Sequence, residues 1–311
     1  MSEKSLVVGA AGFIGGVLTA RLLELGHSVL GVDSFNETLY PATNRRKKIM
    51  ELQLRGLQFV EEDASRSGVL DDLVKDVDVV YNLAAVPGLT PSWTNFEAYE
   101  KANVLLVQRL LHAIKELPST HLVHASTSSI FGAHAGASSE EVPNSPYGVT
   151  KLAAEKLIRA YSDEFGVSYT ILRYFSVYGL EPRPDQFFAL ILERLSRGEP
   201  IVIFGDGNNS RTNTHVDDIV EATIRAGTMR SLNCALSISG TEPATTQEIV
   251  NMVAAEMGVT PLVTFQERRR GDQRATEGDI GPANAVLGWV PQISLAEGIK
   301  AMVSDYLGGS K

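Results

Sequence analysis

A glycine-rich segment near the N-terminus constrains the fold of this 311-residue chain more than any other part of its sequence. Gly9 and Gly12 stand between a short β-branched apolar run at residues 5–8 and a helical pattern at residues 14–25, and Gly15 lies in the first turn of that pattern. Glycines at this spacing allow a tight turn, close backbone approach to a pyrophosphate, and tight packing of the following helix. The segment predicts a strand, a turn and a helix whose N-terminus faces phosphate groups.

An acidic residue at the end of the second predicted strand turns this weak signal into a specific one. Asp33 stands where a carboxylate hydrogen-bonds the two hydroxyls of a dinucleotide ribose and repels a 2′-phosphate. The sequence therefore predicts NAD, not NADP, as cofactor; the structural alternative is that Asp33 caps a strand end. The basic run at residues 45–48 is interpreted as a solvated helix face, not as a phosphate clamp for NADP.

Short apolar runs alternate with helical patterns through the first half of the chain, which is typical of βαβ units and a parallel sheet. Strands are predicted at 5–8, 28–32, 57–60, 77–82, 121–125 and 169–173, and helices at 14–25, 43–55, 69–75, 95–117 and 146–165. The predicted fold is α/β: a doubly wound parallel sheet (Rossmann) with a smaller mixed α/β substrate domain. We expect an NAD-binding domain over 1–177, to which 212–231 returns, and a substrate-binding domain over 178–311. In the second domain a helix is predicted at 186–197, a strand at 201–204 and a final helix at 295–307.

Composition narrows the possible partners. A net charge of −9 disfavours nonspecific attraction to nucleic acid or an anionic membrane, and no apolar stretch is long enough to span a membrane. The single cysteine, Cys234, excludes an intrachain disulfide and favours a cytoplasmic location. No metal site is expected, because His124 and His215 lack partners at ligand spacing; both are interpreted as structural histidines.

The segment around Tyr147 carries the candidate chemistry. Ser145 is a predicted N-cap and Pro146 a first helical residue, so Tyr147 and Lys151 lie one turn apart on one helix face. A neighbouring ammonium, an oxidised nicotinamide and the helix N-terminus would all favour the tyrosine phenolate, which suits a general base. A Tyr-x-x-x-Lys pair alone is usually a surface pair, and it gains meaning here from the glycines and Asp33.

Together these features resemble the extended short-chain dehydrogenases/reductases, the family of nucleotide-sugar epimerases and dehydratases. The resemblance extends over almost the whole chain, through Asp63, the segments 82–85, 126–132 and 173–179, and Asn103. It implies that Asp63 contacts adenine and that Tyr174 lies at the nicotinamide end, although Asp63 and Asn103 could cap loops and Tyr174 could belong to the core. The cofactor contacts it implies are Gly9, Gly12, Phe13, Ile14, Gly15, Asp33, Asp63, Ala64, Leu83, Ala84, Ala85, Asn103, Tyr147, Lys151 and Tyr174.

The resemblance also implies a first chemical step, hydride transfer from sugar C4 to NAD while Tyr147 takes the O4 proton beside Thr127. Dehydratases of the family carry Asp and Glu after this threonine, acting at O6 and C5, whereas this chain has Ser128 and Ser129. Their loss favours a 4-epimerase. The alternative is an atypical dehydratase that eliminates water through a 4-keto intermediate. A further departure from the family pattern is Ser176, which replaces an asparagine that usually contacts the substrate diphosphate.

A second group of residues resembles the family's nucleotide clamp. Arg211 and Arg269 are expected to hold the diphosphate of a UDP-sugar, because a guanidinium pairs bidentately with phosphate oxygens. Asp272 is expected on the nucleotide ribose, and Val202 and Phe204 beside the base. Thr276 matches a size gate beside the sugar C2 substituent, and its small side chain predicts that a UDP-N-acetylhexosamine is accepted.

Other functional classes fit less well. A protein that binds NAD without turnover has no need of Tyr147, Lys151 and Thr127 together, and Asp33 disfavours a reductase that exchanges NADPH. The helices at 95–117 and 146–165 resemble those that pair two subunits in this family. A homodimer is expected on that basis.

Overall fold

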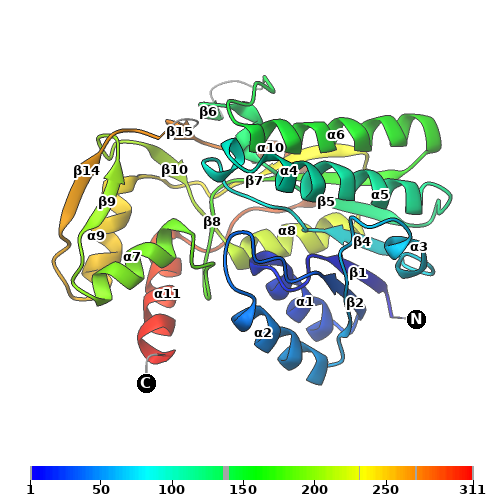
Figure 1. Ribbon diagram of the computed structural model, residues 1–311, viewed down its shortest axis with the longest axis horizontal. Helices are drawn as coiled ribbons and strands as arrows, with labels where there is room; N and C mark the ends of the chain where they lie inside the picture. The colour runs from blue at the N-terminus through cyan, green and yellow to red at the C-terminus, as the bar shows by residue number, and fades with distance from the viewer. Residues whose placement is uncertain (1, 136–139, 231, 270–271, 310–311) are drawn as a thin grey trace.

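The computed structural model describes residues 2–135, 140–230, 232–269 and 272–309, and a seven-stranded parallel sheet forms the centre of its larger lobe (Figure 1). Every neighbouring pair of strands is parallel, which confirms the predicted doubly wound α/β fold. The strands, in spatial order, are β12 (Cys234–Ile238), β7 (Ser168–Tyr174), β5 (His121–Thr127), β4 (Val79–Asn82), β1 (Lys4–Val8), β2 (Ser28–Asp33) and β3 (Gln58–Glu61).

Helices cover both faces of this sheet, each over its own apolar core (Figure 1). One face carries α1 (Phe13–Glu24), α2 (Thr43–Leu54) and α8 (Val216–Thr228). The other carries α3 (Val69–Leu73), α4 (Phe96–Glu100), α5 (Leu106–Ile114) and α6 (Pro146–Phe165). The sheet is thus buried on both faces, which explains why its strands read as nearly continuous apolar runs.

The helix predicted over 95–117 is interrupted by a π-helical turn, Lys101–Leu105, between α4 and α5. This turn holds Asn103, whose amide bonds both backbone groups of Val86 and the hydroxyl of Thr150. A widened turn accommodates an extra residue, and here it directs a polar side chain into the core. The spacing of apolar residues in a sequence does not reveal such a turn.

The sheet gains a strand that the sequence analysis places elsewhere. β12 was expected in the second domain, but it pairs with β7 from Cys234↔Thr170 to Ile238↔Tyr174. α8 returns to the sheet as predicted, and α10 (Gly281–Leu287) packs against β12 and α8. The chain thus crosses back after leaving the sheet, and β12 and α10, which the sequence analysis assigned to the second domain, pack with the first.

The smaller lobe is a mixed α/β unit with its own apolar core. Its helices are α7 (Phe187–Ser196), α9 (Thr246–Glu256) and α11 (Leu295–Gly309), and β9 (Ile201–Phe204) pairs with β14 (Val263–Gln266). A second small sheet contains, in order, β13 (Pro243–Thr245), β10 (Ser210–Thr212), β15 (Ala275–Thr276) and β6 (His134–Ala135). Near the junction of the lobes, β8 (Val177–Tyr178) pairs with β11 (Thr214–His215). Short 3₁₀ turns occur at Pro91–Trp93 and Ser128–Phe131.

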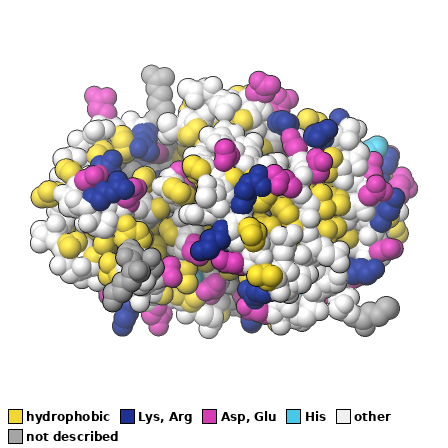
Figure 2. Space-filling view, turned by 60° about the horizontal axis from the view of Figure 1, so that its bottom comes forward, with side chains coloured by type: hydrophobic (Ala, Val, Ile, Leu, Met, Phe, Trp, Pro, Cys, Tyr) yellow, Lys and Arg dark blue, Asp and Glu magenta, His cyan; other side chains and the backbone are white. Residues whose placement is uncertain are grey.

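Charged side chains of both signs lie next to one another on the face shown in Figure 2, where hydrophobic side chains appear in small separate groups. None of the described helices has the length and apolar character to cross a membrane. Among the described residues, no group of three or more His, Cys, Asp or Glu side chains is placed to hold a metal ion.

Candidate active site

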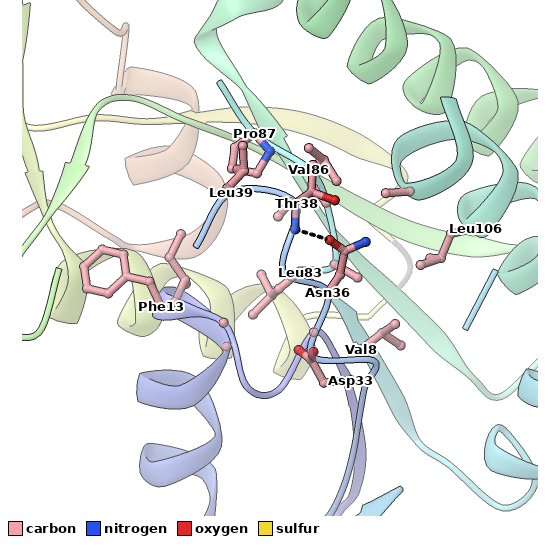
Figure 3. A pocket seen from close by; sticks show the side chains of 18 of the residues that line it. Val8, Phe13, Asp33, Asn36, Thr38, Leu39, Leu83, Val86, Pro87 and Leu106 are labelled. Atoms are coloured by element: carbon pink, nitrogen blue, oxygen red, sulfur yellow. Dashed lines mark hydrogen bonds between the residues drawn. The ribbon is translucent and has the colours of Figure 1, made fainter. Parts of the chain in front are cut away.

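A cavity of about 440 Å³ lies at the carboxyl ends of the central strands, where ligands bind in doubly wound sheets. Figure 3 shows Asp33 at the end of β2, Asn36, Thr38 and Leu39 from the segment that follows, and Val86 and Pro87 drawn next to Thr38 and Leu39. Most of the predicted cofactor residues line it: Gly9, Gly12, Phe13, Ile14, Gly15, Asp33, Asp63, Ala64, Leu83, Ala84, Ala85, Tyr147, Lys151 and Tyr174. The catalytic candidate Thr127 lines it as well.

The glycine turn leaves no room for side chains. Gly9 has φ +88°, and a Cβ on it would lie 2.7 Å from the backbone nitrogen of Ala84. A Cβ on Gly15 would lie 2.0 Å from the carbonyl oxygen of Gly9. Gly12 caps α1 without any side-chain hydrogen bond, so the first N–H groups of the helix remain available to an anion. These residues fit a dinucleotide pyrophosphate.

Asp33 faces the cavity while also organising the backbone around it. Its carboxylate accepts hydrogen bonds from the N–H groups of Ala11 at 3.1 Å and Phe35 at 2.7 Å. A carboxylate has further lone pairs, so ribose hydroxyls can still bond to it. Burial raises the pKa of Asp33, and the two backbone bonds and the Arg45 charge act in the opposite direction.

The interpretation of residues 45–48 as a solvated helix face is wrong for Arg45. Its side chain is 12% exposed, lines the cavity, and places Nη1 3.9 Å from Oδ1 of Asp33. The guanidinium lies over the ring of Tyr40, and its Nε is buried without a hydrogen-bond partner among the described residues. α2 turns this residue inward because Ile49, one turn further along the same face, packs in the core.

Asp63 and Asn103 differ in their relation to the cavity. Asp63 lines it, but its carboxylate also bonds Lys101 at 2.8 Å and both the backbone and hydroxyl of Ser65. Asn103 is fully buried and does not line the cavity. Its bonds to Val86 fix the backbone that forms the cavity wall, so the loop-holding alternative applies to Asn103.

The predicted start of the catalytic helix is confirmed. The Ser145 hydroxyl accepts a hydrogen bond from the N–H of Gly148 at 3.1 Å, and Pro146 opens α6. Tyr147 and Lys151 consequently line the same cavity as Thr127, and Tyr147 packs edge-on against Tyr99 with ring centroids 6.1 Å apart. The three residues that the sequence analysis selected as catalytic candidates therefore line one cavity.

The prediction of a Tyr147 phenolate includes the positive charge of bound NAD, and the chain by itself acts in the opposite direction. Burial raises the pKa of Tyr147, while a hydrogen bond with Thr127 and the charge of Arg183 act to lower it. Burial also lowers the pKa of Lys151 to about 8, against the charge of Glu155, which raises it. The chain alone therefore does not favour the phenolate, because desolvation of two buried groups outweighs the charges nearby.

The sequence analysis missed one residue at this end of the cavity, Arg183, and one contact of Lys151 outside the cavity lining. Arg183 lines it, with Nε and Nη2 bonded to the carboxylate of Asp185 at 3.0 and 2.9 Å. It comes from an irregular loop, where no periodicity marks a functional side chain. His124, interpreted as purely structural, places Nε2 3.3 Å from Nζ of Lys151.

A second cavity of about 510 Å³ lies in the smaller lobe and shares Ser176, Val177 and Gln186 with the first. Ser176 has φ +30°, a conformation that asparagine adopts more readily than serine. The predicted nucleotide residues that line this cavity are Val202, Phe204, Arg211, Arg269 and Asp272.

Arg211 and Arg269, two of the three arginines that line this cavity with Arg194, suit an anionic ligand. The guanidinium of Arg269 lies 3.5 Å from the ring centroid of Phe204. Burial lowers the pKa of Arg211, and Asp272 acts in the opposite direction. Within the described part of the chain, neither arginine forms a salt bridge. Arg270, which follows Arg269 in sequence, lies outside the described residues.

Three predicted substrate residues do not line either cavity. Thr276 is fully buried in β15, where its carbonyl accepts a hydrogen bond from Thr212, so the expected size gate is not placed beside the substrate space. Ser128 and Ser129 are buried directly behind Thr127, and the Ser129 hydroxyl lies 3.2 Å from that of Thr127. Tyr174 lines the first cavity but also belongs to the core, with its hydroxyl 2.8 Å from that of Thr223.

The comparisons with known proteins agree with this geometry. Residues 5–234 match the NAD dependent epimerase/dehydratase family. The chain is 37% identical to an uncharacterised UDP-glucose epimerase of Bacillus subtilis, with 95% of each chain covered. It is 32% identical to a UDP-glucuronate 4-epimerase of Thermodesulfobacterium geofontis, over 96% of this chain and 94% of that one. The crystal structure of UDP-glucuronic acid 4-epimerase from Bacillus cereus with UDP-glucuronic acid and NAD is similar at a TM-score of 0.92 and 37% identity, covering 98% and 99% of the two chains. This chain therefore belongs to the NAD-dependent epimerase/dehydratase family, and the predicted cofactor, NAD, is confirmed.

Proposed function

We propose that this protein is a UDP-sugar 4-epimerase that acts on a UDP-hexuronate. One observation carries the proposal: Thr127, Tyr147 and Lys151 line a dinucleotide cavity that shares Ser176 with a second cavity, and Arg211 and Arg269 line that second cavity. The first cavity suits hydride chemistry and the second suits a nucleoside diphosphate. Relatives that act on UDP-glucose and UDP-glucuronate support the same conclusion.

The chain contributes proton transfer and orientation. Tyr147 takes the proton of the sugar O4 hydroxyl and returns it after the 4-keto sugar has rotated. Thr127, hydrogen-bonded to Tyr147, holds O4 in line, and the Lys151 ammonium stabilises the phenolate. NAD, when bound, supplies the hydride acceptor and a positive charge.

The nucleotide part of the substrate is held in the second cavity. Arg211 and Arg269 provide guanidinium groups for the diphosphate, and Asp272 provides a carboxylate for the nucleotide ribose. Val202 and Phe204 supply an apolar wall for the base. Binding energy from this remote part of the substrate positions the sugar at Tyr147.

Two features favour a uronate over a neutral hexose. Arg183 lines the sugar end of the cavity, and its Nη1 forms no hydrogen bond within the described part of the chain, leaving a donor for a C6 carboxylate. In addition, Ser128 and Ser129 replace the carboxylates that related dehydratases place near C5 and C6. A carboxylate on the substrate is therefore attracted by the Nη1 group of Arg183, and the serines at positions 128 and 129, outside both cavities, add no negative charge nearby.

Two finer expectations concern acceptance of a UDP-N-acetylhexosamine and assembly into a homodimer. Acceptance of a UDP-N-acetylhexosamine depended on Thr276, and its support is weak because Thr276 does not line either cavity. A homodimer through α4–α6 is supported by exposed apolar side chains of Phe96, Leu105 and Val149 on these helices. Light scattering of the purified protein tests the dimer, and a mass of one chain would contradict it. The cytoplasmic location stays a prediction.

The test is incubation of the purified protein with UDP-glucuronate, UDP-glucose and UDP-N-acetylglucosamine, followed by NMR and mass spectrometry. We expect inversion at C4 with unchanged mass, at the highest kcat/KM for the uronate. Loss of water would indicate a dehydratase instead, and absence of any product would contradict an enzymatic role for this site.

Two variants separate chemistry from substrate choice. Tyr147→Phe should lower kcat by at least about 10³-fold with NAD still bound, because the general base is lost. Arg183→Met should lower kcat/KM for the uronate by at least about tenfold more than for UDP-glucose, because only the uronate carries a carboxylate. Equal losses for both sugars would contradict the assignment of Arg183.

A further inference from the structure

A buried chain of polar side chains extends behind the catalytic lysine. Nζ of Lys151 lies 3.3 Å from Nε2 of His124, and Nδ1 of His124 lies 3.1 Å from the amide nitrogen of Asn82. These groups come from α6, β5 and β4, and Asn82 and His124 are direct partners in the parallel pairing of β4 with β5. His124 and Asn82 are fully buried, and neither lines a cavity.

The histidine is the hydrogen-bond partner that the described part of the chain offers to the Lys151 ammonium. The nearest carboxylate on the same helix, Glu155, is already bonded to Arg173 and to the hydroxyl of Ser126. A buried ammonium without an acceptor is costly, and a neutral imidazole nitrogen can accept one of its protons. Burial and the Lys151 charge both hold the pKa of His124 well below its ordinary value, so the ring remains neutral.

We propose that His124 is a positioning residue for the reaction, whose imidazole accepts a hydrogen bond from Lys151 and holds the ammonium beside Tyr147. The inference rests on the proposed function for the role of Lys151. It assigns the ring tautomer, because an ammonium only donates: Nε2 must accept, and the ring proton must be on Nδ1.

Asn82 completes the arrangement. The Nδ1–H group needs an acceptor, and turning the Asn82 amide by 180° brings its oxygen to Nδ1. With the nitrogen facing the ring, Oδ1 is buried without a hydrogen-bond partner among the described residues. The turned orientation gives this oxygen a donor, the Nδ1–H group of His124. In this arrangement Lys151 donates a hydrogen bond to His124, and His124 donates one to Asn82.

The arrangement makes a prediction about pH. The charged group that acts on His124 is Lys151, and the charged group that acts on Lys151 is Glu155, both on α6. The pKa of Lys151 is about 8, so loss of its proton should set the alkaline limb of kcat. Removing the imidazole acceptor destabilises the ammonium, lowers that pKa further, and moves the alkaline limb to lower pH by about one unit.

The first experiment compares the pH profiles of His124→Leu and His124→Gln in NAD-loaded protein. We expect the alkaline limb of His124→Leu to move down by about one unit with KM within about twofold, since His124 lies outside both cavities. His124→Gln retains an acceptor and should restore most of the shift. An alkaline limb unchanged in His124→Leu would overturn the proposal.

His121 provides a matched control on the same strand. It is also fully buried, and its two ring nitrogens bond the hydroxyls of Ser168 and Thr170 instead of a catalytic group. His121→Leu should lower stability without moving the pH profile. An equal shift in this variant would show that any buried histidine of β5 produces the effect, and would refute the assignment of His124.

The second experiment needs no turnover and therefore separates this proposal from the proposed function. Protein labelled with ¹⁵N in histidine, with NAD bound, is studied by long-range NMR correlation at pH 7, and His124 is assigned with His124→Gln. We expect a neutral ring protonated on Nδ1, and in Lys151→Met a change in the Nε2 shift as its donor is lost. A ring protonated on Nε2 would overturn the proposal even in a fully active enzyme.

Discussion

The contact between Asp33 and Arg45 predicts how the cofactor preference can be changed. Asp33→Asn removes the negative charge while retaining the shape of the side chain and one oxygen for the backbone. A 2′-phosphate on the ribose bound there would lie about 4 Å from this carboxylate, similar to the 3.9 Å between Asp33 and Arg45. At an effective dielectric constant of about 20, each pair of unit charges at that distance contributes about 4 kcal/mol.

The magnitude needs little correction for solvent, because the two side chains are only 11% and 12% exposed. About 4 kcal/mol corresponds to roughly three decades in affinity. Part of it is offset in the wild type by Arg45, so we expect the ratio of Kd for NADP to Kd for NAD to fall by about 100-fold in Asp33→Asn. Arg45, released from its carboxylate, then pairs with the phosphate.

Titration calorimetry of cofactor-free protein with NAD and with NADP measures both constants. The matched control is the double variant Asp33→Asn/Arg45→Met, which should lose most of the gain for NADP because no cation remains to bind the phosphate. The reasoning is refuted if the ratio changes less than about tenfold in the single variant, or if the double variant binds NADP as well as the single one.

Two further predictions concern the framework of the site. Gly15→Ala should abolish NAD binding, because its Cβ would lie 2.0 Å from the carbonyl oxygen of Gly9. In Gly16→Ala the new Cβ meets only the flexible end of the Lys48 side chain, so this variant should bind NAD normally. Calorimetry with NAD measures both affinities, and equal values would contradict the steric argument. Glu155→Gln should lower the free energy of unfolding by about 3 kcal/mol in urea titrations, because Arg173 loses its fully buried partner, and adding Arg173→Met should recover part of that loss. A loss below about 1 kcal/mol for Glu155→Gln would contradict this account.

The parts of the fold that were predictable carry local signals. α6 begins and ends where the sequence indicates, because Ser145 caps it, Pro146 fits its first turn, and Gly166 adopts the left-handed conformation after its last residue. The glycine turn and Asp33 likewise depend on residues within one βαβ unit. Each of these features is decided by neighbours in sequence.

The parts that were missed depend on what lies opposite in space. The sequence of β12 has no feature that distinguishes it from other short strands. It belongs to the large sheet because it pairs with the free edge of β7, which lies far away in the sequence. Arg45 and Lys47 are indistinguishable in sequence, yet one faces the cofactor cavity and the other is 80% exposed. His124 lies in a strand that is buried on both faces of the sheet. Alternation of apolar residues therefore could not show toward which face its side chain points.

The late position of β12 in the chain has a consequence for synthesis. All other strands of the large sheet are complete once residue 174 has been made, but the partner of β7 begins only at Cys234. During that interval β7 is an unpaired edge with free backbone donors and acceptors, the kind of surface that recruits strands from other chains. A fragment ending between residues 178 and 233 should therefore aggregate on release, even though it holds the dinucleotide cavity's glycines and the catalytic helix.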